Sequence, residues 1–208
     1  MIIVSLFKLK YNTETGIYTI ISFMASKCPL CGGGVYYRDS KARGSKNLHG
    51  EERHFSFRRL RCEVCKKLHN ETPDIIQPFK HYDSATIQSV LDGSEDAKDC
   101  AADNATIRRW KSSFAKSEPD IAQRVASVYG QETDEVVPLA ASVMSLSAIK
   151  TMCEHWLAFV MGLLINNGHK ICTQFAFCPL HNSDIIQNVR KNCNERGRKS
   201  DKAITDTS

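Results

Sequence analysis

Two pairs of cysteines, each pair separated by two residues, carry the clearest chemical signal in the sequence. Cys28 and Cys31 form the first pair, Cys62 and Cys65 form the second, and thirty residues separate the pairs. A C-x2-C pair can present two thiolates from one tight turn, and four thiolates complete the tetrahedral shell of a structural zinc ion. The spacing therefore predicts one Zn²⁺ per chain, bound by these four cysteines. Because such a shell leaves no open coordination position, we expect the ion to stabilise the fold and not to catalyse.

Other uses of the cysteines are less consistent with their spacing. Two disulfides or unrelated buried thiols would not require the doubled C-x2-C pattern, and a C-x2-C redox centre would need one pair in a strand–helix context. The chain has nine cysteines, an odd number, and no convincing secretion signal precedes them, which favours a reducing cytoplasm. Cys178 and His181 also have ligand-like spacing, and whether they form a second metal site with Cys172 is left open.

A β-hairpin is expected to bring the two cysteine pairs together. The pattern predicts one strand at 35–38, a polar loop at 40–52 and a return strand at 55–61. Together with the cysteines these elements form an antiparallel zinc ribbon over residues 26–74. The loop is longer than is usual for such sites, which suggests a functional protrusion.

Positive charge is concentrated around this ribbon. Residues 28–80 contain 11 Lys and Arg against 6 Asp and Glu, whereas residues 81–165 contain 7 against 12. On a strand, Arg59 and Arg61 should point to one side and Arg58 to the other, so charge is expected on both faces. Aromatic residues are interleaved with the charges. A solvated surface is the simpler interpretation, but the density of the patch favours nucleic-acid contact through the following residues: Arg58, Arg59, Arg61, Lys66 and Lys67.

Residues 75–117 are expected to form two helices in a helix-turn-helix-like arrangement. Asp83 can cap a short helix that ends at Gly93, and Asp103 can cap a helix at 105–116 whose inward face includes Trp110 and Phe114. The outward face of the second helix is basic and polar, as a major-groove reader requires. Its candidate DNA contacts are Thr106, Arg108, Arg109, Lys111 and Ser112. Residues 81–120 are acidic overall and the connection is long, so a plain surface helix remains the alternative.

The rest of the chain, residues 118–180, has mainly helical apolar spacing. A third helix is expected to begin at Pro119, and a long apolar stripe extends from Leu139 to Leu163. The stripe could be a dimer seam, but core is the more common role. The polar, basic tail at 181–208 is expected to be disordered.

The first 25 residues allow two interpretations. They fit a strand–turn–strand with a turn at Gly16, although translation could instead begin at Met24. The longest apolar run, 156–165, has ten residues. A membrane span needs about 20, so none is expected. The predicted fold class is therefore α+β: an N-terminal zinc ribbon followed by an all-α, helix-turn-helix-like domain.

The sequence resembles the uncharacterised zinc-ribbon and helix-turn-helix proteins associated with bacterial transposons. It is also similar to the N-terminal DNA-binding parts of some transposases. The matching stretches are 28–32, 58–65, 68–74, 78–82, 106–110 and 175–179. The resemblance implies DNA binding for a mobile element, with the four cysteines as ligands and 106–111 in the recognition helix. A full transposase would need three carboxylates on a mixed sheet that hold two metal ions, and the chain after residue 120 is too short and too helical for that domain.

We therefore expect a DNA-binding protein that is accessory or regulatory to a mobile element and has no catalytic activity. Its expected partner is duplex DNA, its expected location is the cytoplasm, with the nucleoid if it is bacterial, and neither a membrane nor a small-molecule substrate is expected. The alternative is an adaptor that docks a transposase, another partner or a second copy of itself through the ribbon and the C-terminal helix. A nuclease or recombinase interpretation lacks a residue set, since Glu154 and His155 do not form an H-E-x-x-H motif.

Overall fold

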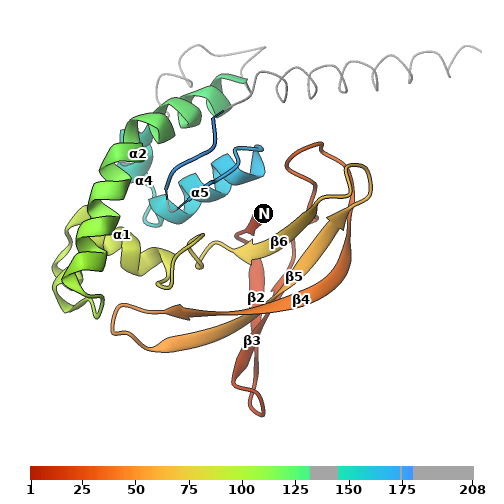
Figure 1. Ribbon diagram of the computed structural model, residues 1–208, viewed down its shortest axis with the longest axis horizontal. Helices are drawn as coiled ribbons and strands as arrows, with labels where there is room; N and C mark the ends of the chain where they lie inside the picture. The colour runs from red at the N-terminus through yellow and green to blue at the C-terminus, as the bar shows by residue number, and fades with distance from the viewer. Residues whose placement is uncertain (132–144, 174, 180–208) are drawn as a thin grey trace, which may run out of the picture. The chain divides into compact units, whose positions relative to one another are not determined.

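Six strands in the described part of the chain form one mixed sheet, which begins at the N-terminus (Figure 1). The computed structural model describes residues 1–131, 145–173 and 175–179. The strands are β1 (Ile2–Val4), β2 (Phe7–Asn12), β3 (Ile17–Ser22), β4 (Val35–Lys46), β5 (Glu52–Cys62) and β6 (Leu68–Pro73). The helical elements are α1 (Ser84–Asp92), the 3-10 turn η1 (Glu95–Asp99), α2 (Asn104–Gln131), α4 (Leu146–Met152) and α5 (Trp156–Asn166). The predicted α+β class is confirmed.

Strand β5 is the centre of the sheet. Its whole length pairs with β4 in antiparallel fashion, while its other edge pairs first with β3 in parallel and then with β6 in antiparallel orientation. Strand β1 pairs in parallel with β6, and β2 pairs with β3 through a turn at Gly16, whose φ is 67°. The strand–turn–strand predicted for the N-terminal segment is therefore confirmed, and β1 adds a third strand to it.

The predicted polar loop at 40–52 is wrong, because most of it is strand. Strand β4 continues to Lys46, which pairs with Glu52 at the start of β5, and the turn occupies only residues 47–51. The Asn47 carboxamide oxygen accepts from the backbone N–H groups of His49 and Glu51 and so closes that turn. The ladder uses backbone groups, which are the same for polar and apolar residues. Because β4 is mostly exposed and its side chains are polar, the sequence pattern does not show how far the strand extends.

The caps predicted for the first two helices are confirmed. The Asp83 carboxylate accepts from the Thr86 N–H at 2.8 Å, and Gly93 ends α1 in the left-handed conformation with a φ of 68°. The Asp103 carboxylate accepts from the Thr106 N–H at 2.8 Å at the start of α2. The long connection between Gly93 and Asp103 contains the 3-10 turn η1. These ends were predictable because each cap depends on residues close in sequence.

Two predicted helix boundaries are wrong. Pro119 lies inside α2 and does not begin a new helix, since Phe114, Ile121 and Val125 continue one buried stripe on both sides of it. The long apolar segment is two helices, because the chain leaves helical geometry at 153–155. The described part of its stripe is core, which favours core over a dimer seam. Leu139 and Val143 lie outside the described residues, as does the tail predicted at 181–208.

Strand β1 joins the sheet to the helices. Ile3 packs in the main helical core, whereas Ile2 and Val4 pack with Leu60 of β5. The Asn166 carboxamide at the end of α5 accepts from the Ile3 N–H at 2.9 Å and donates to its carbonyl at 2.8 Å, as a neighbouring strand would. Helix α5 consequently lies between α2 and the sheet (Figure 1).

Residues 1–177 form one unit of the structure, and only Cys178 and Pro179 are described in the second unit, 178–208. Within the described residues, none of the helices combines the length and the apolar character that crossing a bilayer requires.

Lys80, in the segment between β6 and α1, gives a pH-dependent prediction. Its Nζ lies 4.3 Å from the Phe175 ring centroid, and burial, together with the charge of Arg109, lowers its pKa to about 8. The unfolded chain holds this proton up to its ordinary pKa of 10.5, so the unfolded state binds more protons between these values. Stability contributed by this group therefore rises with pH across that window, by up to about 3 kcal/mol. Denaturant titrations at the two ends should show the rise in the wild type but not in Lys80→Met; equal pH dependence in both proteins would contradict the assignment.

Candidate metal centre

Two tight turns at one end of the sheet position the four cysteines. The first turn, 28–33, leads into β4, and the second, 62–67, connects β5 to β6. Cys28 and Cys62 each donate a backbone N–H across their turn at 2.9 Å, to the carbonyls of Gly33 and Lys67. The residue after the second cysteine has positive φ in both turns, 70° at Gly32 and 59° at Lys66. The turns thus share one backbone form, although only the first has the glycine that this conformation favours.

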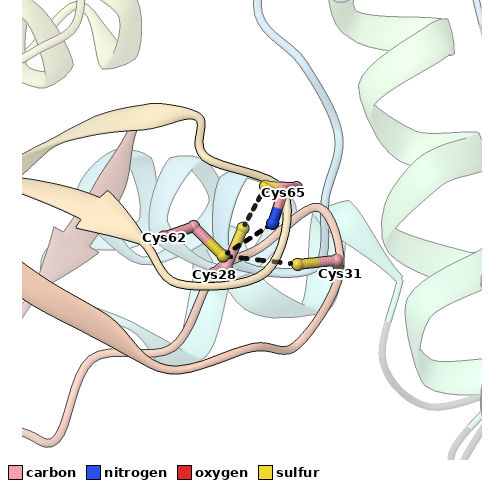
Figure 2. Close-up of side chains that lie close together, drawn as sticks. All are labelled: Cys28, Cys31, Cys62 and Cys65. Carbon is pink, nitrogen blue, oxygen red and sulfur yellow. Dashed lines mark hydrogen bonds between the residues drawn. The ribbon is translucent and has the colours of Figure 1, made fainter.

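The four thiol groups converge on one point. All four sulfurs lie within 4.8 Å of one another, with Cys28 Sγ 3.6 Å from Cys65 Sγ and Cys31 Sγ 3.5 Å from Cys62 Sγ (Figure 2). A disulfide would need about 2.05 Å, and all four residues are free thiols. In a tetrahedral centre with Zn–S bonds of about 2.3 Å, neighbouring sulfurs lie about 3.8 Å apart. The cluster is therefore a candidate metal site whose geometry is compatible with structural zinc.

The protonation of these thiols depends on their burial. Burial raises the pKa of Cys28 to about 12 and also raises the pKa of Cys31. Burial acts in the same direction on Cys62, but the backbone N–H groups of Cys65 and Val64 outweigh it and lower the pKa of Cys62 to about 7. Four thiolates together therefore require a cation to compensate their charge, and metal uptake should release protons.

His69 lies directly behind the cluster and was not predicted. The residue is 3% exposed, and its Nε2 lies 3.3 Å from Cys28 Sγ. Burial lowers the pKa of this imidazole to about 4, so it is neutral at physiological pH. A neutral imidazole can hydrogen-bond to the Cys28 sulfur and orient it.

A second unpredicted group, Glu71 of β6, holds the first cysteine turn to the sheet. Its carboxylate is 1% exposed and accepts from Arg58 at both oxygens, at 2.6 and 2.8 Å. The Ser26 hydroxyl, two residues before Cys28, donates to the same carboxylate at 2.6 Å. The sequence signal for these two residues was their spacing, because polar residues at 69 and 71 share one face of a strand beside the second cysteine pair. Polar side chains on the inner face of a strand indicate buried polar partners.

The basic residues predicted on the ribbon differ in their availability to a ligand. Arg58 is paired with Glu71, and Arg59 forms a two-pronged ion pair with Asp39 of β4. Arg61 is exposed and donates from Nε to the Lys66 carbonyl at 3.3 Å. Lys66 and Lys67 are also exposed. The guanidinium groups of Arg58 and Arg59 thus form ion pairs within the sheet. The accessible positive charge lies on the second cysteine turn.

The helix predicted to read DNA has the expected faces. Trp110 and Phe114 are buried, whereas the outward candidates Arg108, Arg109, Lys111 and Ser112 are exposed. The hydrogen-bond donors of Thr106 are already used in the helix cap, since both its backbone N–H and its hydroxyl donate to the Asp103 carboxylate at 2.8 Å. The basic face of α2 therefore begins one turn after its N-terminus.

The second metal site that the sequence left open is not supported by the described residues. Cys172 and Cys178 are disulfide-bonded and do not offer thiolates, and His181 lies outside the described residues. The cysteine cluster is the metal-site candidate found in the described part of the chain.

Comparison with known proteins gives a local match. The sequence profile of a domain of unknown function (DUF6431) matches residues 28–110. This stretch begins at Cys28, includes all four clustered cysteines and ends in the first turns of α2 with Arg108 and Arg109. Searches of curated proteins and of solved structures found no match.

Proposed function

We propose that this protein binds duplex DNA through the exposed basic face of α2, with a structural zinc ion in the cysteine cluster and without catalysis. We assign it as an accessory or regulator of a mobile element, as its resemblance to transposon-associated proteins implies. Residues 26–74 form the zinc ribbon of this proposal, and α1 and α2, which η1 connects, form the helix-turn-helix-like reader, with the DNA contacts on α2 alone.

The observation that carries the proposal is the two-sided character of α2. One face is anchored in the core through Trp110, which is 3% exposed, and Phe114, which is 5% exposed. The opposite face presents Arg108, Arg109 and Lys111 to solvent. A helix held rigidly on one side with arginines on the other can enter the major groove, where arginine pairs with guanine edges.

The capping carboxylate of Asp103 limits how this helix can approach DNA. Because it lies at the N-terminus of α2, a phosphate at that end would meet a negative charge. We therefore assign the contacts to the second turn of α2, where Arg108, Arg109 and Lys111 lie, and we assign Thr106 only a capping role.

Salt dependence and arginine substitution test the proposal together. With about four to six phosphates neutralised, the slope of log K against log salt should be roughly −4 to −5. Arg108→Ala and Arg109→Ala should each weaken binding to a preferred site by about 1–3 kcal/mol if they contact base edges. The preferred site comes from selection of bound sequences from a random duplex pool, and gel-shift titrations measure the affinities.

Lys98→Ala is the matched control for these substitutions. Lys98 is an exposed cation on η1 that is ion-paired with Glu95, so its loss should leave DNA affinity nearly unchanged. Absence of DNA binding by zinc-loaded protein even at low salt, at which phosphate contacts are strongest, would refute the proposal.

One observation favours a second candidate, an adaptor that binds another protein. Strand β2 is at the edge of the sheet, and large apolar side chains around the β2–β3 hairpin are exposed: Leu6, Leu9, Tyr11, Ile21, Phe23 and Met24. Exposed strand edges with apolar side chains are typical docking surfaces. Most apolar side chains of α5 are buried, with Phe159 at 43% exposure as an exception, so this version uses the hairpin and not the C-terminal helix. Copurification with a transposase by protein that has no intrinsic DNA affinity would favour it.

A further inference from the structure

A cavity lies next to the cysteine cluster and away from the basic face of α2. It has a volume of about 390 Å³ and is lined by both cysteine turns and by the chain that follows α5. Pro29 and Leu30 of the first turn form one wall with Lys67 and Leu68, and Gly168 and Ile171 belong to the other. A volume of this order is that of a small-ligand site, and an α-helix about 10 Å across would not fit.

The charge of this cleft selects for an anion. Lys67 and Lys170 line it, both are exposed, and neither forms an ion pair with any described residue. None of its described lining residues carries a carboxylate. Lys67 also continues the accessible charge of Lys66 and Arg61 on the second cysteine turn. A phosphate at the mouth would therefore meet two cations and no opposing charge.

Phe79 gives the cleft an aromatic face at a conformational cost. Its ring side chain lines the cleft and is 54% exposed, and its φ is 60°. It follows Pro78 in a turn closed by the Lys80 N–H on the Gln77 carbonyl at 3.3 Å. Proline followed by a residue with positive φ is the type II pattern, and that second position is normally Gly or Asn. A bulky aromatic residue in this conformation is strained, and such strain is concentrated at ligand sites.

We infer that this cleft binds one unpaired nucleotide of a nucleic-acid strand, with the base stacked on Phe79 and the phosphate between Lys67 and Lys170. Stacking on an aromatic ring together with backbone neutralisation is how single strands are held without sequence preference. The inference rests on the proposed function only in taking a nucleic acid as the partner. It adds a second site, so that the protein binds duplex on α2 and an unpaired nucleotide at the cysteine end.

The test uses the full-length, zinc-loaded protein and a short, labelled, single-stranded oligothymidylate, with binding followed by fluorescence anisotropy. Phe79→Asn removes the ring but keeps a residue that accepts positive φ. It should weaken single-strand binding about tenfold, as loss of one stacked base predicts. The same variant should have an equal or higher denaturation midpoint, because the strain is relieved. Phe79→Trp should retain binding.

Two further variants separate this site from the rest of the molecule. Replacing Lys67 and Lys170 together by Ala should lower the salt slope for the single strand by about 0.7, the value for the one phosphate that the two lysines neutralise. Phe23→Asn is the matched control: Phe23 is 69% exposed but lies outside the cleft, and its loss should leave binding unchanged.

The outcomes distinguish the two proposals. Arg108→Ala with Arg109→Ala should lose duplex binding and keep single-strand binding; if duplex binding is absent from the start while single-strand binding depends on Phe79, only the proposed function of α2 fails. Absence of single-strand binding, wild-type affinity in Phe79→Asn, or equal competition by polyglutamate, which would indicate an acidic peptide site, would each overturn the inference.

Discussion

Removal of the metal should unfold the cysteine end of the sheet and cost on the order of 10 kcal/mol of folding free energy. The four thiols lie within 4.8 Å of one another on the turns beside β4, β5 and β6, and four thiolates this close need a cation to compensate their charge. Cys62→Ser should reproduce the effect, because a hydroxyl is a poor zinc ligand. Chelator titration followed by circular dichroism and by amide exchange over residues 28–72 measures it.

Cys100→Ser is the matched control for the metal prediction. Cys100 is a free, partly buried thiol outside the cluster, so its loss should change stability by less than about 1 kcal/mol and leave metal content unaltered. If the chelator removes the metal while the exchange protection of residues 28–72 persists, the metal does not hold the fold together.

Loss of Arg58 should destabilise the fold by about 3 kcal/mol, near the lower end for breaking a buried ion pair because the arginine itself is partly exposed. The Arg58→Met variant leaves the Glu71 carboxylate, which is 1% exposed, without its guanidinium. The Ser26 hydroxyl alone cannot compensate that charge, and Ser26 leads directly into the first cysteine turn. Chemical denaturation measures the loss.

A double variant and a matched arginine complete this test. Replacing Arg58 and Glu71 together by Met removes the stranded charge and should recover much of the lost stability. Arg61→Met should lower the free energy of unfolding by less than about 0.5 kcal/mol, since Arg61 is exposed and donates a hydrogen bond to a single carbonyl. If Arg58→Met has wild-type stability and loses only DNA affinity, the structural role of Arg58 is contradicted. Arg58 would then be a DNA-contacting surface residue, as the sequence suggested.

The features that could be predicted from the sequence are local. A two-residue spacing fixes the geometry of each cysteine turn, and the caps at Asp83 and Gly93 depend on residues within the first and last turns of α1. The inward face of α2 follows from a repeat of three and four residues, which Trp110 and Phe114 obey. In each case the atoms that interact are within about one turn of each other along the chain.

The features that could not be predicted depend on pairing between distant segments. The length of β4 is set by its backbone hydrogen bonds with β5. The polar side chains of β4 give no indication of this pairing. Glu71 becomes the partner of Arg58 only after β6 pairs with β5, and His69 reaches Cys28 across 41 residues. The strong propensity of proline for the first helical position predicts a helix start at Pro119, but the buried stripe through Ile121 and Val125 outweighs it.

X-ray absorption at the zinc edge of the purified, full-length protein addresses the centre on which both binding proposals depend. We expect one zinc per chain with four sulfur neighbours at about 2.3 Å and no oxygen neighbour. Metal content well below one per chain, or a first shell that includes a water oxygen or fewer than four sulfurs, would contradict the account.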